Sequence, residues 1–111
     1  MATVVVRMNF CSKTHRITVT ARDDGDMDLT VDSDCPEVMT YAERIGKVIT
    51  MEDVTDINNS RVLSPENLST ITLTCLAPNG ILNAAWLECG MMSPKMAKEV
   101  RENTVSFELV E

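Results

Sequence analysis

The sequence feature that most constrains the fold is a turn set between two runs that alternate apolar and polar residues. The runs span residues 15–21 and 26–31, and Asp24-Gly25 lies between them. Alternation with a period of two predicts strands that bury one face, and Asp-Gly between two such runs is typical of a tight β-hairpin. We therefore expect an antiparallel pair of strands that carries Ile17 and Leu29 into a core.

Two further segments have the composition of strands. Residues 3–10 are rich in β-branched residues, and residues 104–110 alternate with Val105, Phe107 and Leu109 on one side. Together with the hairpin they predict a sheet of about four antiparallel strands. In this arrangement the final segment of the chain supplies the fourth strand.

Helices are predicted between and after these strands. Apolar residues at helical spacing predict one helix from Pro36 to Gly46. A second and more apolar helix is expected to begin at Pro78 or Asn79 and to end at Gly90. Shorter helices are expected to start at the capping residues Thr50, Ser64 and Ser93. The sum is an α+β fold of two layers, with the helices packed on one face of the sheet, in a single domain over residues 1–111.

The charge balance limits the partners. The net charge is −7, and the ten basic residues are scattered along the chain. A nucleic-acid partner requires a positive stripe and an anionic membrane requires a basic patch, so we expect neither. No apolar run reaches membrane-spanning length, and the start of the chain does not resemble a signal peptide. These observations predict a cytoplasmic protein whose four cysteines are thiols or metal ligands rather than disulfides.

Three of the four cysteines occupy corners of the predicted fold. Cys11 ends the first strand, Cys35 lies beside the start of the first helix, and Cys75 precedes the apolar helix. Unpaired N–H groups and the macrodipole at a helix start favour a thiolate, so we expect a lowered pKa for Cys35 and Cys75. Cys89 shares the apolar face of its helix and is expected to fill space in the core.

The residues alone leave two interpretations of these cysteines open. Corners of this kind can converge at one end of a two-layer domain, and three thiolates there could bind zinc or an iron–sulfur cluster, with a fourth ligand from Asp34, His15 or solvent. The separations are long and no Cys-x-x-Cys is present, so the thiols could equally pack as small hydrophobic groups. Cys11 and His15 can share a metal only if the chain bends between them, and a buried, hydrogen-bonded histidine is the commoner arrangement.

Most of the chain resembles a family of small uncharacterised archaeal and bacterial proteins with three cysteines. The resemblance rests on Cys11, on Ser33-Asp34-Cys35 and on the segment from Cys75 to Leu82, which includes Pro78 and Gly80. Leu76 and Asn79 stand where the family has Pro and Ser, and Thr72 stands where a histidine is expected. The family has no established activity, so the resemblance implies an architecture and makes Pro78 and Gly80 neighbours of the site.

A looser resemblance links the chain to iron–sulfur scaffolds of the IscU/NifU type. Cys11, Cys35 and Cys75 follow the order of that scaffold's three cysteines and roughly their spacing, whereas its Gly-Cys-Gly and His-Cys signatures are absent. The likeness implies that the three thiols converge. It is a likeness of architecture, and architecture alone does not assign function.

The first hypothesis for function is therefore a small metal-binding or cluster-binding protein with Cys11, Cys35 and Cys75 as ligands and Asp34 as neighbour or fourth ligand. The alternatives are a protein-interaction or homodimeric module whose cysteines only pack, and a thiol-redox protein that uses Cys35 or Cys75. The chain shows no nucleophile–base pair and no glycine-rich phosphate loop, which disfavours an enzyme.

Overall fold

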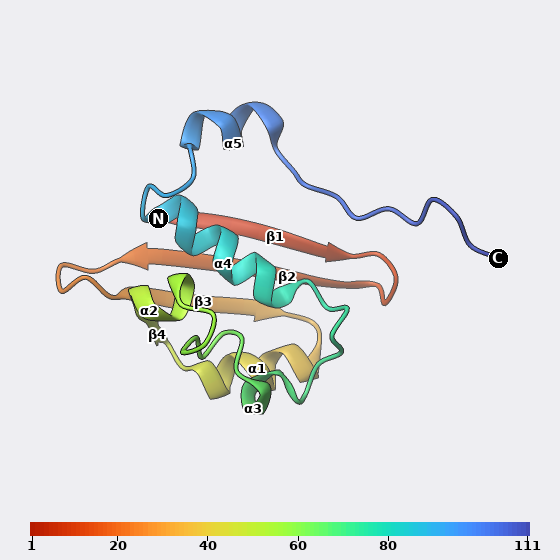
Figure 1. Cartoon of the computed structure of the whole chain (residues 1–111), viewed down its shortest axis with the longest axis horizontal. Coiled ribbons are helices and arrows are strands. Elements are labelled where there is room, and N and C mark those ends of the chain that lie inside the picture. The colour runs from red at the N-terminus through yellow and green to blue at the C-terminus, as the bar shows by residue number, and fades with distance from the viewer.

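The computed structural model describes residues 1–111 and contains a four-stranded antiparallel sheet with helices over one face (Figure 1). The strands lie in chain order across the sheet: β1 (Ala2–Met8), β2 (Lys13–Ala21), β3 (Met27–Ser33) and β4 (Val48–Ile49). The predicted α+β class is confirmed. Because the strands lie in chain order across the sheet, β1 and β4 form its two edges.

The predicted hairpin is present and sets the register of the sheet. Ile17 on β2 lies opposite Val4 on β1 and Val31 on β3. The turn between β2 and β3 is closed by a hydrogen bond of 2.9 Å from the Arg22 N–H to the Asp26 carbonyl. Gly25 adopts a φ of 92° there, a conformation that glycine reaches without steric cost.

Five helices complete the chain, and all of them were expected from the sequence within a few residues. They are α1 (Pro36–Ile45), α2 (Met51–Thr55), α3 (Pro65–Leu68), α4 (Ala77–Glu88) and α5 (Pro94–Val100). The capping box predicted at the start of α2 forms, with reciprocal bonds between Thr50 and Asp53. None of these helices has the length and apolarity required to span a bilayer.

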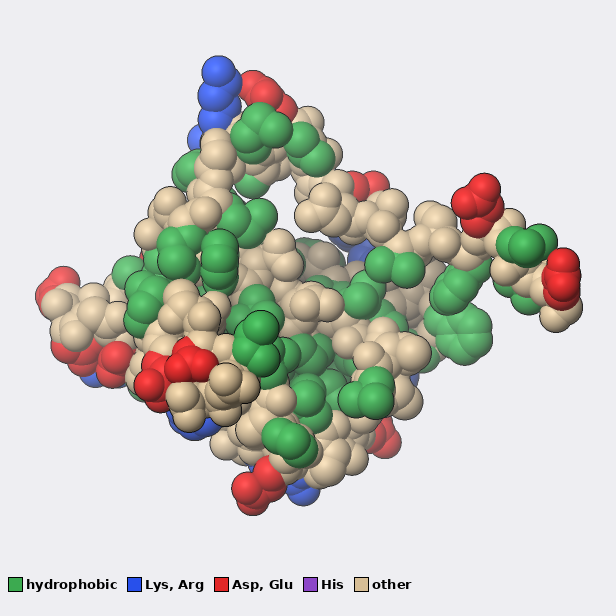
Figure 2. Space-filling view, in the orientation of Figure 1, with side chains coloured by type: hydrophobic (Ala, Val, Ile, Leu, Met, Phe, Trp, Pro, Cys, Tyr) green, Lys and Arg blue, Asp and Glu red, His purple; other side chains and the backbone are tan.

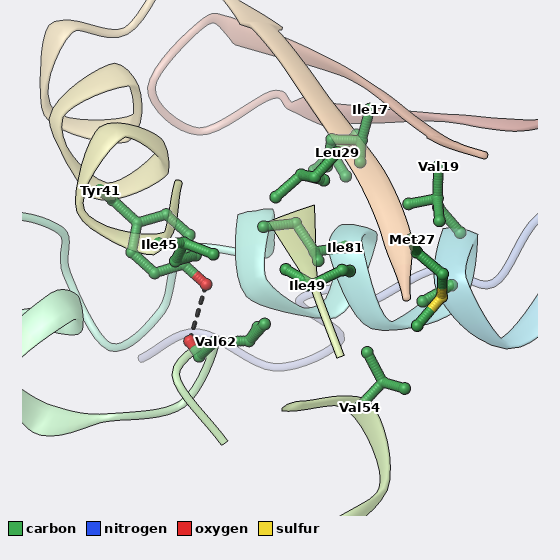
Figure 3. Close-up of a cluster of buried hydrophobic side chains, with 13 residues drawn as sticks. Ile17, Val19, Met27, Leu29, Tyr41, Ile45, Ile49, Val54, Val62 and Ile81 are labelled. Atoms are coloured by element: carbon green, nitrogen blue, oxygen red, sulfur yellow. Dashed lines mark hydrogen bonds between the residues drawn. The ribbon is translucent and has the colours of Figure 1, made fainter. Parts of the chain in front are cut away.

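The core lies between the sheet and its helices (Figure 3). Alternate residues of β2 and β3 meet α1 and α4, as the period-two pattern predicts. Thirteen buried side chains form this cluster: Val6, Ile17, Val19, Met27, Leu29, Tyr41, Ile45, Ile49, Val54, Val62, Ile81, Ala84 and Ala85. The Tyr41 hydroxyl donates a 2.7 Å hydrogen bond to the carbonyl of Val62, which fixes the loop before α3 to α1.

The prediction for the fourth strand is wrong. Residues 101–111 have no regular structure, and the fourth strand is β4, which pairs with β3 through only two residue pairs. A strand of two residues is too short to show a period of two, so no sequence pattern predicts it. The final segment alternates correctly but makes no ladder hydrogen bonds, and Val105 and Phe107 remain 73% exposed.

Helix α4 crosses the inner face of β1 and β2 at close range, and Gly80 makes this possible. A Cβ atom added at Gly80 would lie 2.5 Å from Cγ2 of Val6 and 2.7 Å from Cδ1 of Ile17. Both distances are far below van der Waals contact, so a side chain there has to displace the sheet or the helix. The glycine is therefore required by the packing distance and not by its backbone angles.

Gly80→Ala is expected to destabilise the protein by about 1 kcal/mol, because overpacking costs about 1–3 kcal/mol and the better helix propensity of alanine returns about 1 kcal/mol. Urea unfolding measures the change in the free energy of unfolding. Val6→Ala removes the nearest obstructing atom, so the double variant Gly80→Ala/Val6→Ala should lose less than the two single losses added together. Additive losses would show that the close approach is not the cause.

Candidate functional site

The loops that carry Cys11, Cys35 and Cys75 all lie at the end of the sheet where β1 and β3 finish (Figure 1, right-hand side). Cys11 is exposed in the β1–β2 turn, and Cys35 is the N-cap residue of α1, directly after β3. Cys75 precedes Leu76, the N-cap residue of α4. Antiparallel order brings the first two corners together, and the loop that leads into α4 passes the same end.

Hydrogen bonds connect the Cys11 turn to the Cys35 corner. Asp34 accepts a 3.0 Å bond at Oδ1 from the backbone N–H of Thr14, and its carbonyl lies 3.5 Å from Nζ of Lys13. The adjacent corner is closed by Ser33, whose hydroxyl accepts a 2.9 Å bond from the Cys35 N–H. Asp34, predicted as a neighbour or fourth ligand, therefore fixes the two corners to each other through its side chain and backbone.

The loop that carries Cys75 is attached to the same region through α1. The Thr70 hydroxyl donates a 3.0 Å hydrogen bond to the carbonyl of Glu37, two residues after Cys35. Burial raises the pKa of the Cys75 thiol, and negative charge on Cys35 and Cys11 raises it further. A hydrogen bond from the N–H of Ala77 to the Cys75 sulfur, at 3.5 Å, offsets part of this rise. Both other thiols are thus within electrostatic range of Cys75.

The raised pKa of Cys75 contradicts the lowered value expected for a cysteine at a helix start. The helix begins two residues later, and its first N–H reaches the sulfur only at 3.5 Å, so the loss of hydration outweighs the attraction of the helix start. A thiol of this kind is mostly protonated near neutral pH. This disfavours Cys75 as the nucleophile of a redox enzyme.

Each thiol has a separate contact in this structure. Cys11 donates to the carbonyl of Met8 at 3.8 Å, and Cys35 donates to Oε2 of Glu37 at 3.3 Å. No three histidine, cysteine or carboxylate side chains form a ligand set that could hold a metal ion. The corners therefore share one end of the sheet, while their side chains point to different partners.

His15 lies on the buried face of β2 and is almost fully inaccessible. Its Nδ1 lies 2.7 Å from the Ser33 hydroxyl, which confirms the expected hydrogen bond, but its Nε2 is buried without any partner. Burial lowers the pKa of the ring, and the charge of Asp34 offsets only part of that effect. The imidazole is therefore neutral at pH 7, with one nitrogen unsatisfied.

Pro78 and Gly80 are buried in the first turns of α4, where the sequence predicted neighbours of the site. Gly80 lies over Val6, and the register pairs Val6 with His15. Gly80 thus helps to position α4 over the sheet close to His15. Neither residue has a side chain that could bind a ligand.

Cys89 behaves as predicted. It lies at the other end of α4, packs against the core, and its thiol donates to Sδ of Met27 at 3.2 Å. Burial raises its pKa, and Glu88 contributes further. A partly buried sulfur next to another sulfur in the core is a packing contact.

Two residues near the cysteines were not identified from the sequence. The carboxylate of Glu37 accepts a hydrogen bond from the Cys35 thiol. The pKa of the Glu37 carboxyl group is lowered first by a hydrogen bond from the backbone N–H of Glu37 and then by the one from that thiol. The Tyr41 hydroxyl is buried, and its pKa is raised by burial and by the charge of Cys75. A glutamate in a first helical turn and a tyrosine on an apolar face are common, so neither gave a signal.

The comparisons with known proteins identify a family and no function. No curated protein and no solved structure matches the chain significantly. The pattern of one protein family matches residues 2–100 and leaves Met1 and residues 101–111 outside. This coverage confirms the membership of an uncharacterised family, whereas the likeness to iron–sulfur scaffolds remains untested. The chain belongs to DUF6951, a family of unknown function.

Proposed function

We propose that the protein binds a thiophilic metal, as a zinc ion or an iron–sulfur cluster, through Cys11, Cys35 and Cys75, with Asp34 beside them. The observation that carries the proposal is the convergence of three thiol-bearing corners on one end of the sheet, where Cys11 and Cys35 both act on the pKa of Cys75. Thiolates are the preferred ligands of zinc and of iron–sulfur clusters.

Binding requires the thiols to leave their present contacts. Cys11 and Cys35 each hold one weak hydrogen bond at the surface, and such bonds contribute about 1 kcal/mol or less. Structural zinc bound by thiolates and imidazoles contributes about 10–16 kcal/mol in small peptides, so rotation of these side chains is energetically accessible. The buried Nε2 of His15 has no hydrogen-bond partner, so it is available as a further metal-ligating nitrogen at this end of the sheet.

The test is elemental analysis of protein purified anaerobically without a histidine tag, together with a count of free thiols. We expect near-stoichiometric zinc or iron, and visible absorbance distinguishes a cluster from zinc. Cys11→Ser, Cys35→Ser and Cys75→Ser should each lose most of the metal. Cys89→Ser is the matched control and should retain it, because Cys89 contacts Met27 in the core. Metal-free protein with four titratable thiols would overturn the proposal.

A second candidate is a protein-interaction module that uses the same end of the sheet. Two exposed apolar side chains favour it: Phe10 is 87% exposed beside Cys11, and Leu73 is 93% exposed shortly before Cys75. Contact surfaces are typically built from exposed apolar side chains gathered in one patch, and these two residues lie in the loops that carry Cys11 and Cys75. In that case the serine variants remain folded and metal-free, whereas Phe10→Ser and Leu73→Ser weaken the partner complex. Either function fits a reduced cytoplasmic compartment, since all four cysteines are free.

A further inference from the structure

The final segment, residues 104–110, has no partner strand, and its Phe107 ring lies 6.0 Å from the ring of Phe10 in the β1–β2 turn. Figure 2 shows it projecting beyond the body of the molecule, with hydrophobic and acidic side chains on its surface. Val105, Phe107 and Leu109 alternate with polar residues, yet none of them is less than 73% exposed. The segment also lies outside residues 2–100, which match the family. It is therefore an addition with the pattern of a strand and no sheet to join.

Strand β1 offers a free edge to such a segment. It pairs only with β2, so the N–H and C=O groups of every second residue point to its other side, where no strand accepts them. Val4 and Met8 are only partly buried at this edge, where they pack against the core. Charged residues or prolines commonly protect exposed edges, and β1 carries only Arg7. An apolar strand placed here would extend the core beyond Val4 and Met8.

A groove marks the beginning of this edge. It has a volume of about 490 Å³ and is bounded by Ala2 and Thr3 of β1 and by Lys98 and Arg101 at α5. The acidic residue in the groove, Glu88, is already paired: its carboxylate contacts the N-terminal ammonium at 2.9 Å and accepts the Ala21 N–H at 2.7 Å. The remaining charge in the groove is positive. The end of the chain is acidic, with Glu108 and Glu111.

Charge complementarity therefore favours an antiparallel arrangement, in which the acidic end of the segment lies in the groove and Val105 lies opposite Met8. The chain's own segment cannot adopt it. Arg101 lines the groove, and Val105 follows four residues later, at most about 14 Å away. Met8 is six strand residues from Ala2, about 20 Å along β1. Its own segment can only run parallel to β1, the direction seen in Figure 1.

We infer that the protein forms a homodimer in which residues 104–110 of each copy add as an antiparallel fifth strand to β1 of the other copy. The exchange is reciprocal, so a two-fold axis closes the assembly and no free edge remains on the β1 side. Val105, Phe107 and Leu109 then face the inner side of the sheet beside Val4 and Met8. This inference is independent of metal binding.

The test is the mass of the full chain in solution by light scattering, combined with hydrogen exchange of the final segment. We expect twice the chain mass of 12.3 kDa, with slowly exchanging amides in residues 104–110. Ser106→Pro removes a ladder donor, so the mass should fall two-fold and the protection should be lost. Asn103→Pro, just before the segment, is the matched control and should leave both unchanged.

Two results would overturn the inference. A wild-type mass of 12.3 kDa excludes the dimer, and protected amides in that monomer would mean that the segment pairs in parallel with its own β1. A dimer that survives Ser106→Pro would be held together elsewhere, for example by direct pairing of two β1 edges.

Discussion

Asp53→Ala is expected to lower the free energy of unfolding by about 3 kcal/mol, because it leaves a network of buried hydrogen bonds without its acceptor. The carboxylate is 3% exposed and accepts from three groups: the Thr50 N–H at 2.9 Å, the Arg61 N–H at 3.0 Å and the Arg61 guanidinium at 2.6 Å. Removal of one partner from a fully buried ion pair costs about 3–5 kcal/mol, and the 45% exposure of Arg61 places this pair at the lower end.

Urea unfolding measures this loss, and Glu52→Ala is the matched control. Glu52 is an exposed acidic residue in the same helical turn, and its replacement should change stability by less than about 0.5 kcal/mol.

The contribution of Asp53 to stability also depends on pH. Burial raises its pKa, but hydrogen bonds from Arg61 and Thr50 reverse this and hold the pKa below the ordinary value. Its contribution is therefore complete above pH 4 and lost as the pH falls through the lowered pKa. Equal loss of stability in Asp53→Ala and Glu52→Ala would contradict the role given to the Asp53 carboxylate.

Tyr41→Ala is expected to destabilise the protein by about 3–5 kcal/mol, the usual cost of deleting a fully buried aromatic ring. The Tyr41 ring is completely inaccessible and packs against Ile45 and Val62 in the core cluster (Figure 3). Its hydroxyl also donates to the Val62 carbonyl at 2.7 Å. Burial raises the pKa of this hydroxyl, so it is protonated and donates at neutral pH.

Tyr41→Phe separates the two contributions. It retains the ring and leaves the Val62 carbonyl without its donor, which costs about 1–3 kcal/mol. Thermal unfolding of both variants gives the ratio of ring packing to hydrogen bonding. If Tyr41→Phe proved as damaging as Tyr41→Ala, the hydroxyl rather than the ring would hold the loop before α3 in place.

Local patterns in the sequence were sufficient for most of the fold. Alternation and an Asp-Gly turn predicted β2 and β3, and capping residues predicted the starts of the helices, because these signals act within a few residues. The fourth strand was misassigned for a non-local reason. Whether residues 104–110 form a strand depends on a free partner edge, and alternation within the segment carries no information about that edge.

The positions of the three cysteines in the fold were predictable from the sequence, and the chemistry of their thiols was less so. The placement of Cys11, Cys35 and Cys75 at corners follows from the order of the elements, and the structure brings those corners to one end. The pKa of Cys75 was predicted in the wrong direction, since burial depends on the loop that covers the thiol and not on its distance from a helix start. The unpaired Nε2 of His15 is likewise set by packing between distant segments.

The close contact at Gly80 has a mechanical consequence for the cysteines. A helix backbone that rests directly on Val6 and Ile17 can neither slide nor roll without a clash, so α4 and the β1–β2 hairpin move as one rigid body. Any approach of Cys75 to Cys11 and Cys35 beyond rotation of the side chains therefore has to come from the loop between α3 and α4 and not from movement of α4 itself.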